Sequence, residues 1–210
     1  TLELSKAVDQ LPVAAFLIVT PYYNKPVQEG LYRHFSLIAD AVQRPVILYN
    51  VPGRTGVDLI PETTIRLAGH GNIIAIKEAT GDLGRVEPLR EGCGSEFLLL
   101  SGDDGTSCEF MLRGGDGCIS VTANVAPAQM RELCDAARSG DRDSAIRIDG
   151  TLRALHEALF FESNPIPVKW AVEQLGYAGP GIRLPLTGLA AQYHQGLLAA
   201  MHTAEIEVGA

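Results

Sequence analysis

The chain has 210 residues, of which 46% are apolar, and a formal net charge of −8. This length predicts one domain, or a large part of one, with enough apolar residues for a sizeable core. The negative charge disfavours nucleic acid and anionic membrane surfaces as partners, because both bind clusters of lysine and arginine. It does not exclude anionic metabolites, since one well-placed arginine can hold a carboxylate.

The four cysteines and five histidines have the spacing neither of a disulfide framework nor of a metal site. We therefore expect no metal, and a reducing, cytoplasmic compartment. No run of about 18 apolar residues is present, which predicts no membrane span, and no secretory leader is recognised. The chain begins with Thr1, and residues 2–11 are typical of the second half of a helix, so we expect an N-terminally incomplete protein.

Five short apolar runs predict strands. Each run is continuous rather than alternating, which is typical of strands buried on both faces of a parallel sheet. The runs span residues 14–19, 46–49, 73–76, 97–100 and 118–121.

Helical patterns follow the runs and give a repeated strand–loop–helix unit. They span residues 28–42, 61–68, 82–90, 107–112 and 126–138. Three further helical segments have no strand between them and span residues 141–161, 167–175 and 188–201. We therefore expect an α/β part over residues 1–139 and a C-terminal helical extension over residues 140–210.

Repeated βα units fit either a doubly wound open sheet or a (β/α)8 barrel. The glycine fingerprint of a dinucleotide site must follow a strand, whereas the glycine-rich stretch 114–117 precedes one. In a barrel, the chemistry takes place at the carboxyl ends of the strands. Polar and reactive groups collect at these ends, in residues 20–24, 49–56, 77–80, 101–104 and 122–124.

Lys77 carries the clearest chemical signal. It alone of the four lysines directly follows a buried-type strand. Desolvation there would lower the pKa of the amine and leave it neutral enough to attack a carbonyl. The alternative is an ion pair between Lys77 and Glu78 or another neighbouring carboxylate.

Tyr49 lies on the strand that precedes Lys77 in the chain, and such strands usually neighbour each other in space. Its phenol could transfer protons during imine formation, although a strand tyrosine is more commonly part of the core. Tyr22 and Tyr23 present the same choice, with a packed loop or an interface as the commoner outcome.

Arg54 lies in a Pro-Gly-Arg-Thr-Gly turn, where it could clamp a substrate carboxylate with two hydrogen bonds. The alternative is a surface arginine paired with Asp58 or Glu62. Asp103 and Asp104 could suggest a metal site, but without further ligands an N-cap role for Asp104 is the better interpretation.

Together these motifs resemble those of the dihydrodipicolinate synthases, also called 4-hydroxy-tetrahydrodipicolinate synthases. The resemblance runs nearly end to end and is carried by residues 19–26, 48–56, 76–82, 100–104, 117–124 and 164–169. It implies a (β/α)8 TIM barrel, here represented by about the last five βα units plus the helical extension. It also implies a class I aldolase-type lyase that condenses pyruvate with L-aspartate 4-semialdehyde in lysine and diaminopimelate biosynthesis.

The resemblance assigns three catalytic roles. Lys77 would form the imine with pyruvate, so that a covalent intermediate takes the place of a cofactor. Tyr49 would transfer protons. Tyr23 would be lent across a tight dimer interface to the neighbouring subunit's site, within a homotetramer built as a dimer of dimers.

The resemblance also assigns binding roles. Arg54 would bind the carboxylate of aspartate semialdehyde. Gly102 and Ile119 would line the pyruvate pocket, largely through their backbone. Tyr22 would stand near the interface where lysine, a possible feedback inhibitor, binds in some members.

The sequence departs from the family in one respect. A full member has three more N-terminal βα units and a Gly-Thr-Thr-Gly-Glu motif whose threonine relays protons between the two tyrosines. Thr63 and Thr64 follow Pro61 and Glu62 and do not match that motif. Since five strands cannot close an eight-stranded barrel, we expect this chain alone not to fold into an active enzyme.

Two other functions stay open. A sister pyruvate-dependent aldolase, such as N-acetylneuraminate lyase or a 2-keto-3-deoxy-sugar-acid aldolase, would also keep Lys77 and Tyr49. Arg54 favours a short carboxylated aldehyde over a sugar aldehyde, and so favours the synthase. An inactive fragment that retains only interface surfaces is the third possibility.

Overall fold

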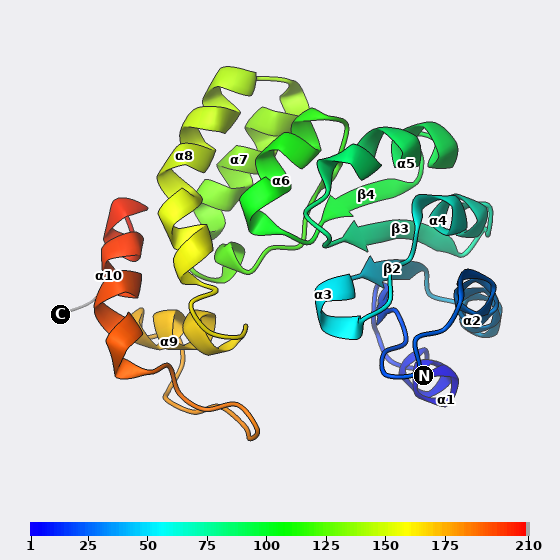
Figure 1. Cartoon of the computed structure of the whole chain (residues 1–210), viewed down its shortest axis with the longest axis horizontal. Coiled ribbons are helices and arrows are strands. Elements are labelled where there is room, and N and C mark those ends of the chain that lie inside the picture. The colour runs from blue at the N-terminus through cyan, green and yellow to red at the C-terminus, as the bar shows by residue number, and fades with distance from the viewer. Residues whose placement is uncertain (209–210) are drawn as a thin grey trace. The chain divides into compact units, whose positions relative to one another are not determined.

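The computed structural model describes residues 1–208, which form two compact units (Figure 1). The first unit is Thr1–Ile119 and the second begins at Ser120. Within the described residues, no helix combines the length and the apolar character needed to cross a bilayer. The sequence predicts that the barrel part ends at residue 139 and that the helical extension begins at residue 140. This boundary stays a prediction.

The first unit is built on a five-stranded parallel sheet whose strand order follows the chain. Its strands are β1 Phe16–Val19, β2 Val46–Asn50, β3 Ile73–Glu78, β4 Leu98–Ser101 and β5 Gly117–Cys118. Sequential parallel strands joined by helices are the βα repeat that the apolar runs predict. The α/β class and the partial (β/α)8 barrel are therefore confirmed.

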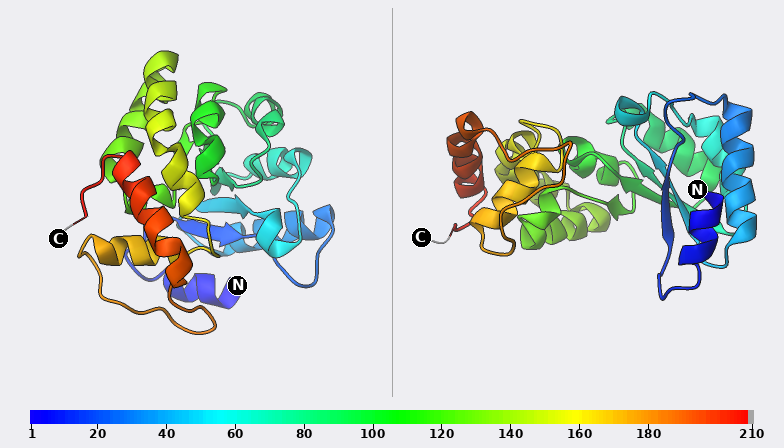
Figure 2. Two further views of the ribbon diagram at one scale, coloured as in Figure 1. Left: turned by 60° about the vertical axis from the view of Figure 1, so that its left-hand side comes forward. Right: turned by 90° about the horizontal axis from the view of Figure 1, so that it is seen from below.

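The helices expected in the first unit are all present, and α3 is an additional short helix. They are α1 Leu2–Val8, α2 Gln28–Ala41, α3 Pro52–Thr55, α4 Pro61–Ala68, the 3-10 turn Leu83–Arg85, α5 Val86–Cys93 and α6 Asp104–Leu112. Pro61 occupies the first turn of α4, and the Asp82 carboxylate accepts a hydrogen bond from the Gly84 N–H at 2.9 Å. Helices α1 and α2 lie side by side (Figure 2).

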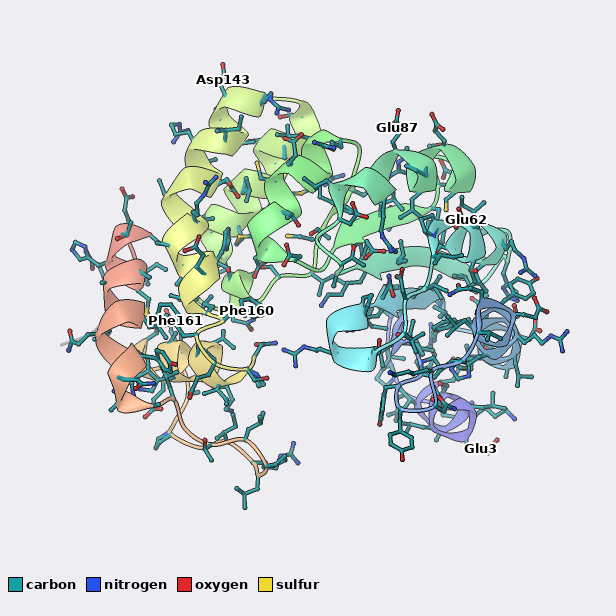
Figure 3. All side chains as sticks on the ribbon, viewed as in Figure 1. Glu3, Glu62, Glu87, Asp143, Phe160 and Phe161 are labelled. Carbon is teal, nitrogen blue, oxygen red and sulfur yellow. The ribbon has the colours of Figure 1, made fainter. Side chains whose placement is uncertain are left out.

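The two faces of the sheet differ in burial. Outward-pointing strand residues such as Leu48, Ile76 and Leu99 are fully buried in a core that includes residues of α2, α4, α5 and α6. The alternate residues point to the inner face, where Leu17 is 45% exposed and Leu98 is 39% exposed. The helices thus cover the outer face, as in a barrel wall. Glu62 of α4 and Glu87 of α5, both labelled in Figure 3, are exposed residues of the helices that cover the outer face.

Two details of the sequence prediction are wrong. The fifth strand stops at Cys118 rather than at residue 121, because it pairs only with β4 and the Ser120 hydroxyl then accepts the Ala123 N–H at 2.9 Å to begin a turn. Helix α6 begins at Asp104 rather than Ser107, so Asp103, in an extended conformation, is the N-cap residue and Asp104 is not.

The second unit is helical, as expected. Its elements are the 3-10 turn Thr122–Asn124, α7 Pro127–Ser139, α8 Arg142–Ala158, α9 Ile166–Gln174, the 3-10 turn Ala191–Tyr193 and α10 His194–Thr203. Helix α8 contacts both α7 and α10, and its buried residues recur every three or four positions. After α8, Phe160 and Phe161 stay exposed (Figure 3), and Phe161 stacks on Tyr193 with ring centroids 5.5 Å apart.

Candidate active site

The register of the sheet brings the predicted strand-end residues into one row. Val19 pairs with Tyr49, Tyr49 with Lys77, and Lys77 with Leu100 on four adjacent strands. Residues paired in this way point to the same face. That face is the inner one, which the helices leave uncovered. Tyr49 and Lys77 are therefore direct neighbours on the inner face, at the carboxyl end of the sheet.

Lys77 lies against the ring of Tyr49. Its Nζ atom is 4.4 Å from the ring centroid. Burial lowers the pKa of the Lys77 amine, Asp104 raises it, Arg54 lowers it and Cys118 raises it, and the net result is a pKa below the ordinary value for lysine. A lowered pKa increases the neutral fraction of the amine, which is the form that attacks a carbonyl.

Glu78 is not the partner of Lys77. Successive residues of a strand point to opposite faces, and Glu78 lies on the outer face with 3% exposure. Its carboxylate accepts hydrogen bonds from the Thr80 N–H at 2.9 Å and from the Asn50 amide at 3.2 Å. The predicted alternative of an ion pair between Lys77 and Glu78 is therefore wrong, although the charge of Asp104 does raise the pKa of Lys77.

Gly102 follows β4 and borders the side chain of Lys77. A Cβ atom at position 102 would lie 2.8 Å from Cε of Lys77 and 2.7 Å from Cβ of Ala79. Only glycine therefore fits beside the lysine stem. The Gly102 N–H donates to the Glu78 carbonyl at 2.7 Å, so this residue can face a ligand through its Cα and carbonyl but not through its N–H.

Ile119, like Gly102, has a backbone N–H that is already engaged. It is half-buried, and its N–H donates to the Ser101 carbonyl at 2.8 Å, which extends the contact between β4 and β5 by one residue. Gly102 thus follows the strand that neighbours the strand of Lys77, and Ile119 follows the next strand beyond it. They can line a pocket next to the amine with their carbonyl groups.

Arg54 lies in the last turn of α3, directly after β2. Gly56 closes this helix with φ +68°, a conformation that favours glycine, and its N–H donates to the Pro52 carbonyl at 2.8 Å. Burial raises the pKa of the Tyr49 phenol, and the charge of Arg54 opposes that rise. The guanidinium thus acts electrostatically on both Tyr49 and Lys77.

The alternative prediction for Arg54 was a surface ion pair with Asp58 or Glu62, and Asp58 is already engaged elsewhere. Asp58 accepts hydrogen bonds from Arg85 at 2.9 Å and from Asn50 at 2.9 Å. The aspartate is therefore already engaged with another guanidinium. Arg54 itself is exposed.

Tyr22 and Tyr23 lie in the loop after β1 and extend into solvent. Their exposed fractions are 68% and 94%. Tyr23 adopts φ +69° and Lys25 adopts φ +46°, both in the left-handed region that residues other than glycine rarely occupy. Within this chain the structure does not bury either ring at the site of Lys77, so these two residues stand apart from the cluster of Lys77, Tyr49 and Gly102.

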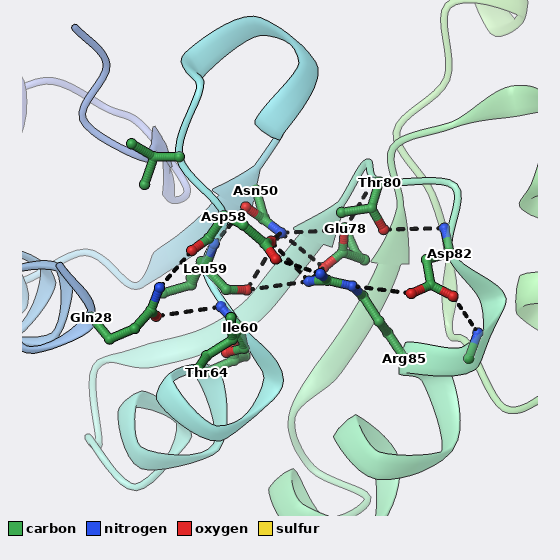
Figure 4. A network of polar contacts seen from close by, with 12 residues as sticks. Gln28, Asn50, Asp58, Leu59, Ile60, Thr64, Glu78, Thr80, Asp82 and Arg85 are labelled. Atoms are coloured by element: carbon green, nitrogen blue, oxygen red, sulfur yellow. Dashed lines mark hydrogen bonds and ion pairs between the residues drawn. The ribbon is translucent and has the colours of Figure 1, made fainter. Parts of the chain in front are cut away.

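A polar network behind the site was not predicted from the sequence (Figure 4). It joins Asn50, Asp58, Glu78 and Arg85 on the outer face of the sheet. The signal in the sequence was the polar residue directly after both Tyr49 and Lys77. Because strands alternate, those residues had to be buried on the other face, where polar groups need partners.

The fold and the site define a class of protein, in which a parallel βα barrel wall carries a desolvated lysine and a neighbouring tyrosine at its carboxyl edge. Within residues 1–208, no group of three or more side chains is arranged to hold a metal ion. The sequence model of the Dihydrodipicolinate synthetase family matches residues 1–204. The chain belongs to that family.

Individual relatives agree with this assignment. The chain is 53% identical over 209 residues to the 4-hydroxy-tetrahydrodipicolinate synthase of Thioalkalivibrio sulfidiphilus, a match that covers 100% of this chain and 71% of the relative. The crystal structure of the chloride-inhibited dihydrodipicolinate synthase of Acinetobacter baumannii complexed with pyruvate superposes with a TM-score of 0.95 at 52% identity, covering 98% of this chain and 71% of that one. The lysine-bound enzyme of Cyanidioschyzon merolae gives a TM-score of 0.93 at 39% identity and covers 97% and 70%.

Proposed function

We propose that the chain carries the catalytic centre of a 4-hydroxy-tetrahydrodipicolinate synthase, which condenses pyruvate with L-aspartate 4-semialdehyde. The observation that carries this proposal is the pairing of Lys77 with Tyr49 on the inner face, where burial lowers the pKa of the amine. Membership of the family and the pyruvate complex of the Acinetobacter relative support the choice of reaction.

In this proposal Lys77 forms the covalent intermediate. The neutral amine attacks the C2 carbonyl carbon of pyruvate, the resulting carbinolamine loses water, and an imine joins Nζ to C2. Loss of a proton from the C3 methyl group gives an enamine, which attacks the aldehyde carbon of the second substrate. The imine supplies the electron sink for this step, so the proposed reaction needs neither a metal nor a cofactor.

Tyr49 is proposed as the group that moves protons during these steps. Burial raises the pKa of its phenol, so the hydroxyl keeps its proton at neutral pH and can donate it to the departing water. Its ring already contacts the lysine amine. Return of the proton from the methyl group of pyruvate would restore the phenol.

Arg54 is proposed to bind the carboxylate of aspartate semialdehyde. A guanidinium can donate two parallel hydrogen bonds to a carboxylate, and this one is exposed and acts electrostatically on both Tyr49 and Lys77. Gly102 and Ile119 are proposed to line the pyruvate pocket through their backbone. The short charged aldehyde is favoured over a sugar aldehyde because a polyhydroxylated acceptor requires neutral hydrogen-bonding groups rather than one guanidinium.

Assembly and regulation belong to the same proposal. Tyr23 is proposed to reach the site of a second copy in a tight dimer, which its 94% exposure in the single chain permits, and two such dimers would form a homotetramer. Tyr22 is proposed to stand near a site for lysine as feedback inhibitor, since the Cyanidioschyzon relative has been solved with lysine bound. A cytoplasmic location is supported by the four cysteines, which carry thiols rather than disulfides.

The test of the function is acceptor choice. The intact protein, meaning the polypeptide that the complete reading frame encodes, is incubated with pyruvate and either L-aspartate 4-semialdehyde or sugar aldehydes, and consumption of pyruvate is followed. We expect turnover with the semialdehyde, and we expect Arg54→Met to raise KM for the semialdehyde. Pyruvate should still form its imine on Lys77 in this variant, although more slowly near neutral pH, because loss of the Arg54 charge raises the pKa of the amine. Preference for a sugar aldehyde would support the sister aldolase instead, and no turnover with any acceptor would support an inactive scaffold.

A further inference from the structure

The outer face of the sheet carries a buried charged network directly behind the reactive pair. Asn50 and Glu78 are register partners at the ends of β2 and β3, one position beyond the register pair of Tyr49 and Lys77. Asn50 is 0% exposed and Glu78 is 3% exposed. Figure 4 shows how their side chains meet those of Asp58 and Arg85.

The contacts in this network fix the orientation of each member. The Leu59 N–H donates to Oδ1 of Asn50 at 2.9 Å, so the amide nitrogen of Asn50 must face the carboxylates. That nitrogen donates to Oε2 of Glu78 at 3.2 Å and to Oδ1 of Asp58 at 2.9 Å. Glu78 also accepts the Thr80 N–H at 2.9 Å.

Arg85 closes the network from the 3-10 turn after β3. Its Nη1 atom lies 2.9 Å from Asp58 and 3.6 Å from Glu78, and its Nε atom lies 3.6 Å from Asp82. One guanidinium thus links carboxylates from three segments, and its charge offsets part of the cost of burying Glu78. The ends of β2 and β3 and the loops that follow them are held as one unit.

The register of the β2–β3 pair needs side-chain contacts of this kind to hold it in place. At the start of the pair, Val46 faces Ile73, whereas Ile47 faces Ala75, so the register shifts by one residue at this point. A one-residue slip at the other end would turn Glu78 to the inner face and Lys77 to the outer face, because side chains alternate along a strand. The bond between Asn50 and Glu78 exists only in the observed register.

We propose that Glu78 is a positioning residue: acting from the outer face, it locks the ends of β2 and β3 so that Lys77 and Tyr49 stand opposite each other on the inner face. This inference rests on the proposed function, because it concerns how fast Lys77 captures pyruvate. Glu78 acts through the backbone and through Asn50, and it does not touch the substrate.

The test compares three forms of the intact protein: wild type, Glu78→Gln and Ile76→Val. The glutamine removes the charge that faces Arg85 and sets an amide donor against either Asn50 or Thr80. Ile76→Val is the matched control, since Ile76 is a buried outer-face residue of the same strand that belongs to the core rather than the network. Each form is mixed with pyruvate, quenched with borohydride after increasing times and at several pH values, and the adduct on Lys77 is quantified by mass spectrometry.

We expect Glu78→Gln to slow adduct formation about tenfold or more, because small displacements of a reacting group are costly. We also expect the rising limb of its pH profile to move to higher pH, as Lys77 leaves its confined place beside Tyr49. The charged groups that act on Lys77 are Arg54 on α3, Asp104 on α6 and Cys118 on β5, and the titratable ring of Tyr49 on β2 contacts its amine. All of them are unchanged in the variant. Loss of the negative charge of Glu78 would by itself lower the pKa of Lys77 and move the limb to lower pH, so a shift to higher pH reports a moved lysine. Ile76→Val should lower the melting temperature and move neither the rate nor the profile.

A wild-type rate with a wild-type pH profile in folded Glu78→Gln would overturn the inference. If that variant does not fold, Asp58→Asn replaces it, because the Asp58 side chain is 34% exposed and lies at the rim of the network. We expect a slowing of about threefold from this milder change, and no slowing would overturn the inference equally. Failure of the wild type itself to form an adduct would instead sink the proposed function, and the inference with it.

Discussion

The amine of Lys77 lies 4.4 Å from the centre of the Tyr49 ring, and the two residues are register partners on adjacent parallel strands. Burial acts on both groups in the direction that favours their neutral forms: it lowers the pKa of Lys77 and raises the pKa of Tyr49. A neutral amine is a nucleophile, and a neutral phenol is a proton donor. The same environment therefore prepares both partners for imine chemistry.

The first prediction concerns stability and pH. Because the folded pKa of Lys77 is lowered, the unfolded state binds more protons between the folded and the ordinary pKa, and the contribution of Lys77 to stability improves as pH rises through that window. Replacing Lys77 by Met should therefore stabilise the intact protein most below the folded pKa and least above the ordinary value. Urea unfolding at pH 7 and pH 10 measures this difference.

The control for this prediction is Lys6→Met on α1, where the lysine forms only an exposed pair with Glu3. It reports what loss of one surface charge does at each pH. A stabilisation by Lys77→Met that grows toward high pH would contradict the assigned direction of the Lys77 shift.

The second prediction concerns Gly102. Alanine at this position would place a Cβ atom 2.8 Å from Cε of Lys77, so the lysine stem must move. Overpacking of this kind typically costs about 1–3 kcal/mol, and we expect pyruvate capture to slow by about tenfold or more. Gly71→Ala serves as the control, because a Cβ atom there meets nothing within 4 Å. Equal capture rates in the two variants would show that Gly102 does not shape the space around Lys77.

The third prediction concerns Tyr23 and a second copy of the chain. If Tyr23 completes the site of a neighbouring protomer, Lys77→Ala and Tyr23→Phe each inactivate the protein, yet a mixed dimer contains one intact site. Refolding the two inactive variants together in equal amounts should then restore about a quarter of the wild-type activity, by the statistics of a two-fold assembly. A mixture that stays inactive would place Tyr23 outside the partner's site.

The fourth prediction concerns stability away from the site. Arg90 of α5 donates to the carbonyls of Gly94 at 2.9 Å, Phe97 at 3.0 Å and Gly114 at 2.8 Å, and it pairs with Asp116. Arg90→Met would leave these acceptors without their donor, which should lower the free energy of unfolding by about 2 kcal/mol.

The matched control is Arg33→Met on α2, whose side chain is 79% exposed in an i,i+4 pair with Glu29. Such exposed pairs contribute about 0.5 kcal/mol or less. Chemical denaturation measures both variants. Equal losses in the two would mean that the loops around Arg90 do not depend on its guanidinium.

Much of the fold could be predicted from the sequence because its signals are local. The apolar runs that end at Val19, Tyr49 and Ile76 predict β1, β2 and β3 to within two residues at their ends, and Pro61 marks the start of α4. The fifth strand was predicted too long, because Cys118 to Val121 is equally apolar in sequence and its end depends on the turn that the Ser120 hydroxyl begins. That contact is local, between residues three apart in the chain, but a single side-chain turn leaves no periodic apolar pattern.

The site divides in the same way. Position after a buried strand was enough to select Lys77 and Tyr49 and to expect them side by side, and the register places them so. The network behind them could not be predicted in detail, since Asp58 joins it from the segment after α3 and Arg85 from the 3-10 turn after β3, and the sequence does not reveal the paths of these segments. Likewise, Asp104 was assigned to a cap, whereas helix α6 begins at this residue and its charge acts on Lys77.

The identity of the lysine that captures pyruvate tests the account most directly. The intact protein is treated with pyruvate and borohydride, digested, and its lysine-containing peptides, including those of Lys6, Lys25, Lys77 and Lys169, are compared by mass spectrometry. The account predicts a reduced pyruvate adduct on Lys77 alone and none in Lys77→Ala. An adduct on another lysine, or undiminished turnover in Lys77→Ala, would contradict it.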